Sequence, residues 1–229
     1  MRSITRTVWA ILSKDLLLEW RERTRTLSVI LFAVVTLLLF SFALGPDVDA
    51  LRSATPGFLT LALLLSSTLA LGESFRLERE DHALEGLVMR PVGAGSIFYA
   101  KALANALLLT LLAPIVVTLA VVLYSLEIGA GSLARLIGCW SLGAAGLAAP
   151  GTLYAAMTSR LKTQDVALPI LLFPLVVPVL LGSVKAMDLV LFGDAMGQLG
   201  SWISLLIAFD VIYWAVCGVL FRFALEEGE

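Results

Sequence analysis

Five stretches of this sequence contain no aspartate, glutamate, lysine or arginine, and each is 19 to 25 residues long. A helix that crosses the hydrocarbon core of a bilayer needs about 20 apolar residues, so each stretch predicts a membrane-spanning helix. A sixth apolar stretch is interrupted only by Asp210 and predicts a span that carries one ionisable residue. The six predicted spans cover approximately residues 26–46, 53–72, 102–126, 136–159, 166–184 and 195–221.

The residues outside these spans are too few to form an independent soluble domain. Of the 229 residues, 59% are apolar and 15% are charged, and the net charge is -2. We therefore predict an all-α, polytopic membrane protein with a single domain, residues 1–229, and we exclude soluble enzymes and nucleic-acid-binding proteins. Cys139 and Cys217 lie inside separate predicted spans, which is typical of buried free thiols.

Lysine and arginine are distributed unevenly between the two sides of the predicted spans. Of the 16 such residues, 13 lie on the side of the N-terminus, and only Arg52, Arg135 and Lys185 lie on the other side. Because cytoplasmic loops next to spans are enriched in these residues, both termini are predicted to be cytoplasmic in a multi-pass membrane protein.

Residues 3–22 precede the first span and predict a helix that lies in the membrane interface. They combine apolar residues with Trp9 and Trp20, and arginines follow them. At 100° per residue, Asp15 and Glu19 fall within the apolar arc of this helix. We therefore expect the helix to pack partly against protein and not only against lipid. The alternative is a cytoplasmic stub that only supplies positive charge.

Residues 73–101 form the longest predicted cytoplasmic segment, and their pattern is that of a charged helix ended by Pro91. Apolar residues share one face of this helix and two glutamates share another. This indicates an amphipathic element that docks on a partner, whereas the alternative is a solvated charged loop. The residues assigned to the docking surface are Glu78, Arg79, Glu80, Leu84, Glu85 and Leu87.

The same segment resembles part of a known superfamily. Permeases of the ABC-2 exporter superfamily have a cytoplasmic helix after the second span, which couples them to a separate ATPase subunit. Those permeases often carry glycine two residues after the second glutamate, where this chain has His82. The residues that carry the resemblance are Glu78-Arg79-Glu80, Leu84-Glu85, Leu87 and Pro91.

The resemblance extends over most of the chain. In length, short outer loops and several motifs, the sequence is similar to the cytochrome c maturation protein B family of heme exporter permeases. The motifs are Lys14-Asp15-Leu16, Glu19-Trp20-Arg21, Ala149-Pro150-Gly151, Pro169, Phe173-Pro174 and Pro178.

The resemblance implies a multi-pass subunit of the bacterial cytoplasmic (inner) membrane. It implies that this subunit works with an ABC ATPase subunit, a heme-handling membrane subunit and a small single-span subunit. It implies that ATP hydrolysis by the partner drives heme delivery or release of a heme-loaded periplasmic chaperone. Two copies are expected, because ABC transporters use two membrane halves and this chain has one six-span set. Two alternatives stay open: an ABC-2 permease that exports a drug, lipid or polysaccharide, and a scaffold of the maturation complex that translocates nothing.

The chain by itself is predicted to be no enzyme and to bind no cofactor. It contains no Gly-x-x-x-x-Gly-Lys-Ser/Thr loop for nucleotide and no Cys-x-x-Cys-His motif for heme attachment. The only histidine is His82, which we interpret as a surface residue of the docking segment. ATP is therefore expected on the ATPase subunit, and heme on another subunit.

Asp210 lies near the middle of the sixth predicted span. An unpaired carboxylate at that depth costs a few kcal/mol, so the side chain is expected to face protein or water. One interpretation is a polar path or a subunit contact. The other is a hydrogen bond to a hydroxyl group on a neighbouring helix, or a position nearer the interface.

Two further features concern helix packing. Pro169, Pro174 and Pro178 remove three backbone donors from the fifth span, which predicts a bent or broken helix that packs inside the protein. Small residues in the fourth span predict a surface for close helix contact, which is either a passive seam or a moving gate. The glycines of this surface are Gly138, Gly143, Gly146 and Gly151.

Overall fold

The structure is a computed structural model that describes residues 2–74, 93–159 and 164–226. The described residues form helices and contain no strand. The helices are α1 (Arg2–Glu22), α2 (Thr24–Leu44), α3 (Val48–Ser74), α6 (Ala94–Leu123), α7 (Ala130–Thr158), α8 (Gln164–Phe192) and α9 (Leu199–Glu226).

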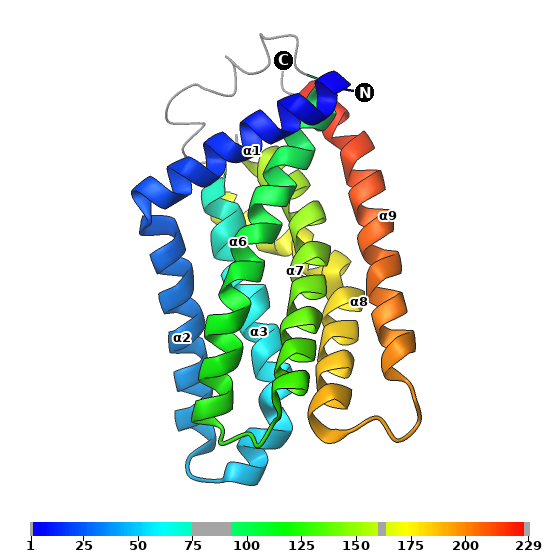
Figure 1. Cartoon of the computed structure of the whole chain (residues 1–229). Helices are drawn as coiled ribbons and strands as arrows, with labels where there is room; N and C mark the ends of the chain where they lie inside the picture. Colours follow the sequence, from blue (N-terminus) through cyan, green and yellow to red (C-terminus); the bar gives the residue numbers. More distant parts are fainter. Residues whose placement is uncertain (1, 75–92, 160–163, 227–229) are drawn as a thin grey trace.

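Six of these helices stand side by side as a bundle, and α1 lies across one end of it, the end at which α9 also finishes (Figure 1). By length and composition, α2, α3, α6, α7, α8 and α9 can each cross a membrane. The predicted all-α polytopic fold with six spans is therefore confirmed. We call the end of the bundle that is covered by α1 the α1 end.

Helix α7 lies at the centre of the bundle and packs against α3, α6, α8 and α9. Its small residues allow this close approach. A Cβ atom added at Gly143 would lie 2.7 Å from Ser183 Oγ, and one at Gly151 would lie 2.3 Å from a methyl group of Leu71. The predicted small-residue contact surface is confirmed at these positions, whereas a Cβ atom added at Gly138 would meet no atom within 4 Å.

Helix α8 runs as one helix through Pro169, Pro174 and Pro178, so it is not broken, and the bend stays a prediction. It does not pack wholly inside the protein. Val176 and Val179 are buried, while Ile170 and Leu181 are 64% and 59% exposed. The expected burial is wrong because α7, whose glycines allow close contact, occupies the centre instead.

Candidate functional site

Helix α1 joins α2 through the single residue Arg23, whose φ of 39° lies in the left-handed region. This sharp elbow lays α1 across the bundle, where it packs against α6. Ile11 and Leu12 of α1 are buried, whereas Trp9 and Leu17 of the same helix are 70% and 64% exposed. The expectation that this helix packs partly against protein is confirmed, and its place in a membrane interface stays a prediction.

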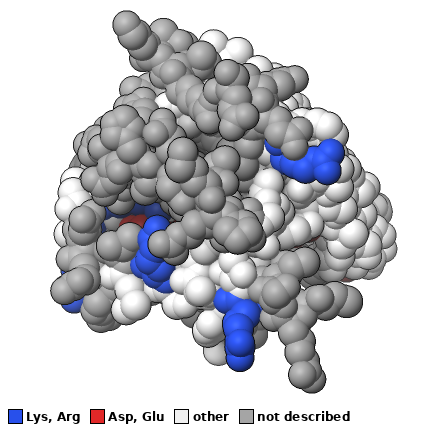
Figure 2. Space-filling view, turned by 90° about the horizontal axis from the view of Figure 1, so that it is seen from above, with Lys and Arg blue, Asp and Glu red and all other residues white. Residues whose placement is uncertain are grey.

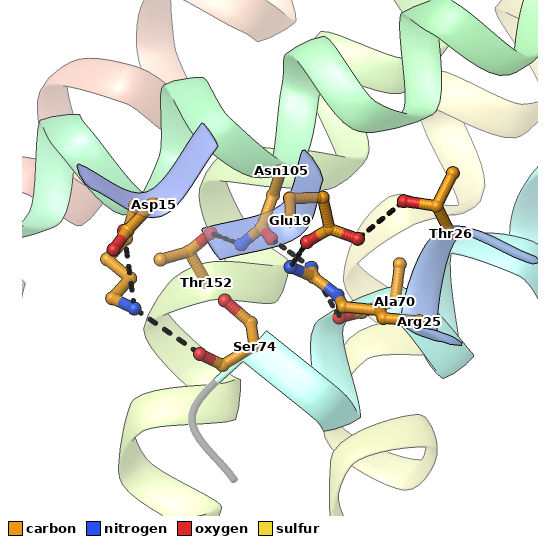
Figure 3. A network of polar contacts seen from close by, with 9 residues as sticks. Asp15, Glu19, Arg25, Thr26, Ala70, Ser74, Asn105 and Thr152 are labelled. Carbon is orange, nitrogen blue, oxygen red and sulfur yellow. Dashed lines mark hydrogen bonds and ion pairs between the residues drawn. The ribbon is translucent and has the colours of Figure 1, made fainter. Parts of the chain in front are cut away.

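Arg25, in the first turn of α2, is the centre of a polar network under α1 (Figure 3). Its guanidinium donates from Nη1 to Glu19 Oε2 at 2.9 Å, and from Nε and Nη2 to the Ala70 carbonyl at 3.2 and 2.7 Å. Nη2 also donates to Asn105 Oδ1 at 2.7 Å. The fork of fixed donors in arginine suits this task, and one side chain thereby joins α1, α2, α3 and α6.

The network continues on both sides of Arg25 (Figure 3). Thr26 donates to Glu19 Oε1 at 2.6 Å, so this carboxylate is bonded through both oxygens. Asn105 is fully buried and donates from Nδ2 to Thr152 Oγ1 on α7 at 3.0 Å. The central helix of the bundle is therefore linked to α1 through side chains alone.

Lys101 makes a second connection to α1. Its Nζ lies 3.4 Å from Asp15 Oδ2 and donates to the Ser74 carbonyl at 3.4 Å, and the residue is 5% exposed. Ser74 is the last described residue of α3. Lys101 therefore ties the end of α3 and the start of α6 to α1.

Sequence reasoning anticipated only the two carboxylates of this network. It placed Asp15 and Glu19 on the inner arc of α1 but counted Arg25 and Lys101 only as charges that flank spans. Asn105 is one amide in an otherwise apolar stretch and was not singled out. Two carboxylates that face a helix bundle need nearby cations. The arginine and the lysine beside the nearest spans could have been recognised as those cations.

The predicted docking residues Glu78, Arg79, Glu80, Leu84, Glu85 and Leu87, together with His82, lie outside the described residues. The chain leaves α3 at Ser74 and enters α6 at Ala94, and the network of Arg25 and Lys101 holds both helices at this end. Seen from this end, the described part carries lysine and arginine at several places around its edge (Figure 2).

Asp210 on α9 lies away from this network. Its Oδ1 atom is buried and has no hydrogen-bond partner among the described residues. It points at Gly146 of α7, where an added Cβ atom would lie 2.8 Å from Oδ1. Within the described part of the chain, no hydroxyl group bonds to this oxygen, so the expected hydroxyl partner is not found there.

Residues 2–74, 93–159 and 164–226 contain neither a cluster of metal ligands nor a disulfide. No group of three or more histidine, cysteine, aspartate or glutamate residues there could hold a metal ion. Cys139 and Cys217 are buried and free, as expected for thiols in separate spans.

The six spans, the crossing helix and the charged network define an all-α polytopic membrane protein. Residues 6–227 match the family model described as CcmB protein, and the chain belongs to that family. The resemblance noted from the sequence is thereby confirmed.

Three relatives illustrate the similarity, and each is named heme exporter protein B. The Escherichia coli K12 protein is 34% identical over 181 residues, which cover 79% of this chain and 81% of the relative. The Pseudomonas aeruginosa protein is 31% identical over 180 residues, covering 76% and 77%. The Bradyrhizobium diazoefficiens protein is 30% identical over 203 residues, covering 89% and 90%.

Proposed function

We propose that this chain is the membrane subunit of an ABC-type heme exporter of the cytochrome c maturation system. Family membership and the shared name of the relatives support heme over a drug, a lipid or a polysaccharide. ATP would be hydrolysed by a partner ATPase, and heme would be held by a heme-handling membrane subunit. A small single-span subunit and a periplasmic heme chaperone complete the proposed set of partners.

The observation that carries the coupling part of this proposal is the placement of the polar network. Residues 75–93 join α3 to α6, and Arg25 and Lys101 clamp those two helices to α1 at the same end. An ATPase that displaces the joining segment would first strain the hydrogen bonds and ion pair of Arg25 and Lys101. Asn105 and Thr152 would pass the load to α7, because coupling is carried by contiguous packed and bonded groups.

The α1 end is proposed to face the cytoplasm, as the ATPase requires. Among the described residues, eight lysines and arginines lie at that end, namely Arg2, Arg6, Lys14, Arg21, Arg23, Arg25, Lys101 and Arg222. The other end has three, which are Arg52, Arg135 and Lys185. This asymmetry supports the orientation, since positive residues are retained in the cytoplasm. The homodimer stays a prediction of the single six-span set.

Cysteine labelling in intact cells tests this orientation. In a chain whose two native cysteines are replaced by serine, Asp49→Cys and Met196→Cys should react with a membrane-impermeant maleimide, because both positions are exposed at the outer end. Lys14→Cys should react only after the membrane is opened. Labelling of Lys14→Cys in intact cells would reverse the proposed orientation.

Charge reversal in the docking segment tests the proposed function. The double variant Glu80→Arg/Glu85→Arg should lose ATPase co-purification or release of the heme-loaded chaperone, because reversal turns a paired contact into repulsion. A single alanine substitution should have little effect, since an exposed ion pair contributes up to about 1 kcal/mol.

The matched control for that experiment is Asp49→Arg/Glu127→Arg, which reverses two exposed carboxylates at the opposite end. It should keep both activities at wild-type levels in membranes that hold equal amounts of the permease. If the Glu80/Glu85 variant also keeps both, residues 73–101 are not the coupling segment. A scaffold would assemble normally with the ATPase, yet this chain would contribute nothing to chaperone release.

A further inference from the structure

A cavity of about 560 Å³ lies under α1, between α2 and α6, and the polar network forms its roof. Four cations line it, namely Lys14, Arg23, Arg25 and Lys101. Three carboxylates also line it, those of Asp15, Glu19 and Glu73. The cavity therefore ends in a charged roof at the α1 end of the bundle.

The rest of the cavity is apolar and lies along the outer surface of the spans. Its walls include Leu27 and Ile30 of α2 and Leu108, Leu111 and Ile115 of α6. Leu27 and Leu111 are 60% and 65% exposed, so the lower part opens sideways on the face that lipid would cover. The shape suits an amphiphile with a charged end near α1 and an apolar chain directed along the spans.

The charges of the roof determine whether the head group of that amphiphile is anionic or cationic. Among the described residues that line the cavity, four cations and three carboxylates leave an excess of one positive charge. Glu19 is paired with Arg25 and Asp15 with Lys101, so two of the carboxylates are neutralised within the protein. Lys14 lies at the rim with 48% of its side chain exposed, at 3.6 Å from Asp15. An anionic head is therefore favoured over a cationic one.

We propose that this cavity binds one anionic phospholipid of the membrane, with the phosphate beside Lys14 and an acyl chain along Leu27 and Leu111. Such a lipid fills the space between α1 and the spans and adds an anion next to the Asp15–Lys101 contact. A lipid that binds the folded chain but not the unfolded chain stabilises the folded state by mass action. This proposal concerns a structural ligand and does not depend on heme being the transported substrate.

Native mass spectrometry of the purified full chain, delipidated in detergent, tests the proposal. The probes are dioleoyl phosphatidylglycerol and dioleoyl phosphatidylcholine. The anionic lipid should bind as a single tight copy and raise the temperature of unfolding, and the zwitterionic lipid should bind more weakly. Equal binding of the two lipids would overturn the assignment of an anionic head.

Two matched pairs of variants locate the site. Leu27→Trp should reduce binding because it fills the cavity wall, whereas Leu31→Trp, on the same helix and 63% exposed, should not. Lys14→Glu should weaken binding by about tenfold or more, because each basic residue near an anionic lipid contributes about 1 kcal/mol. Lys185→Glu, exposed at the opposite end, should leave binding unchanged.

These outcomes decide the proposal without ATPase or heme. Unfolding without added lipid shows that each variant is folded, and all four positions are exposed on the helix surface. Equal binding within either pair would overturn the location. Recovery of heme instead of phospholipid from the freshly purified protein, or displacement of the lipid by stoichiometric heme, would show that the cavity belongs to another ligand.

Discussion

Arg25→Met is expected to destabilise the folded chain by about 3–5 kcal/mol, the range for removal of one partner of a buried ion pair. The substitution removes four donated hydrogen bonds and leaves Glu19, with 19% of its side chain exposed, without its cation. Arg25→Lys should recover only part of the loss, because an ammonium group cannot reproduce the planar fork of donors.

Tryptophan fluorescence during unfolding in mixed detergent micelles would measure this loss, since the chain has five tryptophans. The control is Arg52→Met, which removes a half-buried arginine that is paired with the exposed Glu127 and bonded to the Ser125 carbonyl at the opposite end, and it should cost clearly less than Arg25→Met. Adding Glu19→Gln to Arg25→Met should restore stability in part, because it removes the uncompensated charge. No recovery in that double variant would mean that the pair contributes little.

Gly146→Ala is expected to cost about 1–3 kcal/mol, the range for overpacking in a well-packed interior. The new Cβ atom would lie 2.8 Å from Asp210 Oδ1 and 2.8 Å from a methyl group of Val179. Val179 is fully buried and β-branched, so its rotation is restricted and α8 or α9 must move away from α7.

The control for Gly146→Ala is Gly138→Ala on the same helix, where an added Cβ atom meets nothing within 4 Å. That variant should be neutral or slightly more stable, because alanine has the higher helix propensity. Val179→Ala should rescue part of the loss in Gly146→Ala by making room, and unfolding of the double variant measures the coupling. If Gly146→Ala is as stable as Gly138→Ala, the three helices are not closely packed there.

The fold was predictable because a helix that spans a membrane must be long and apolar, and both properties are read directly from the sequence. Each of the six predicted spans corresponds to a helix, and several of these helices continue beyond the predicted span into residues that carry charges. Helix α3 begins at Val48, five residues before the predicted span, and includes Asp49 and Arg52 in its first turns. Helix α6 likewise begins at Ala94 and contains Lys101, whose charge is neutralised by α1.

The site was less predictable because its contacts join residues far apart in the chain. Asn105 is 80 residues from Arg25, and nothing in the uncharged stretch around it indicates that partner. Asp210 was recognised as an anomaly by its depth, yet its facing residue, Gly146, has no side chain from which the contact could be inferred. Periodicity showed which side chains point inward, and only the tertiary fold showed what they meet.

The elbow between α1 and α2 also bears on the order in which the chain assembles during membrane insertion. The contacts of Glu19 with Arg25 and Thr26 span only six and seven residues, and such local contacts form faster than distant ones. Arg25 can therefore enter the interface already paired, before Ala70 and Asn105 have been synthesised. We infer that the elbow forms first during synthesis, and that the ends of α3 and α6 pack against it as each helix leaves the ribosome.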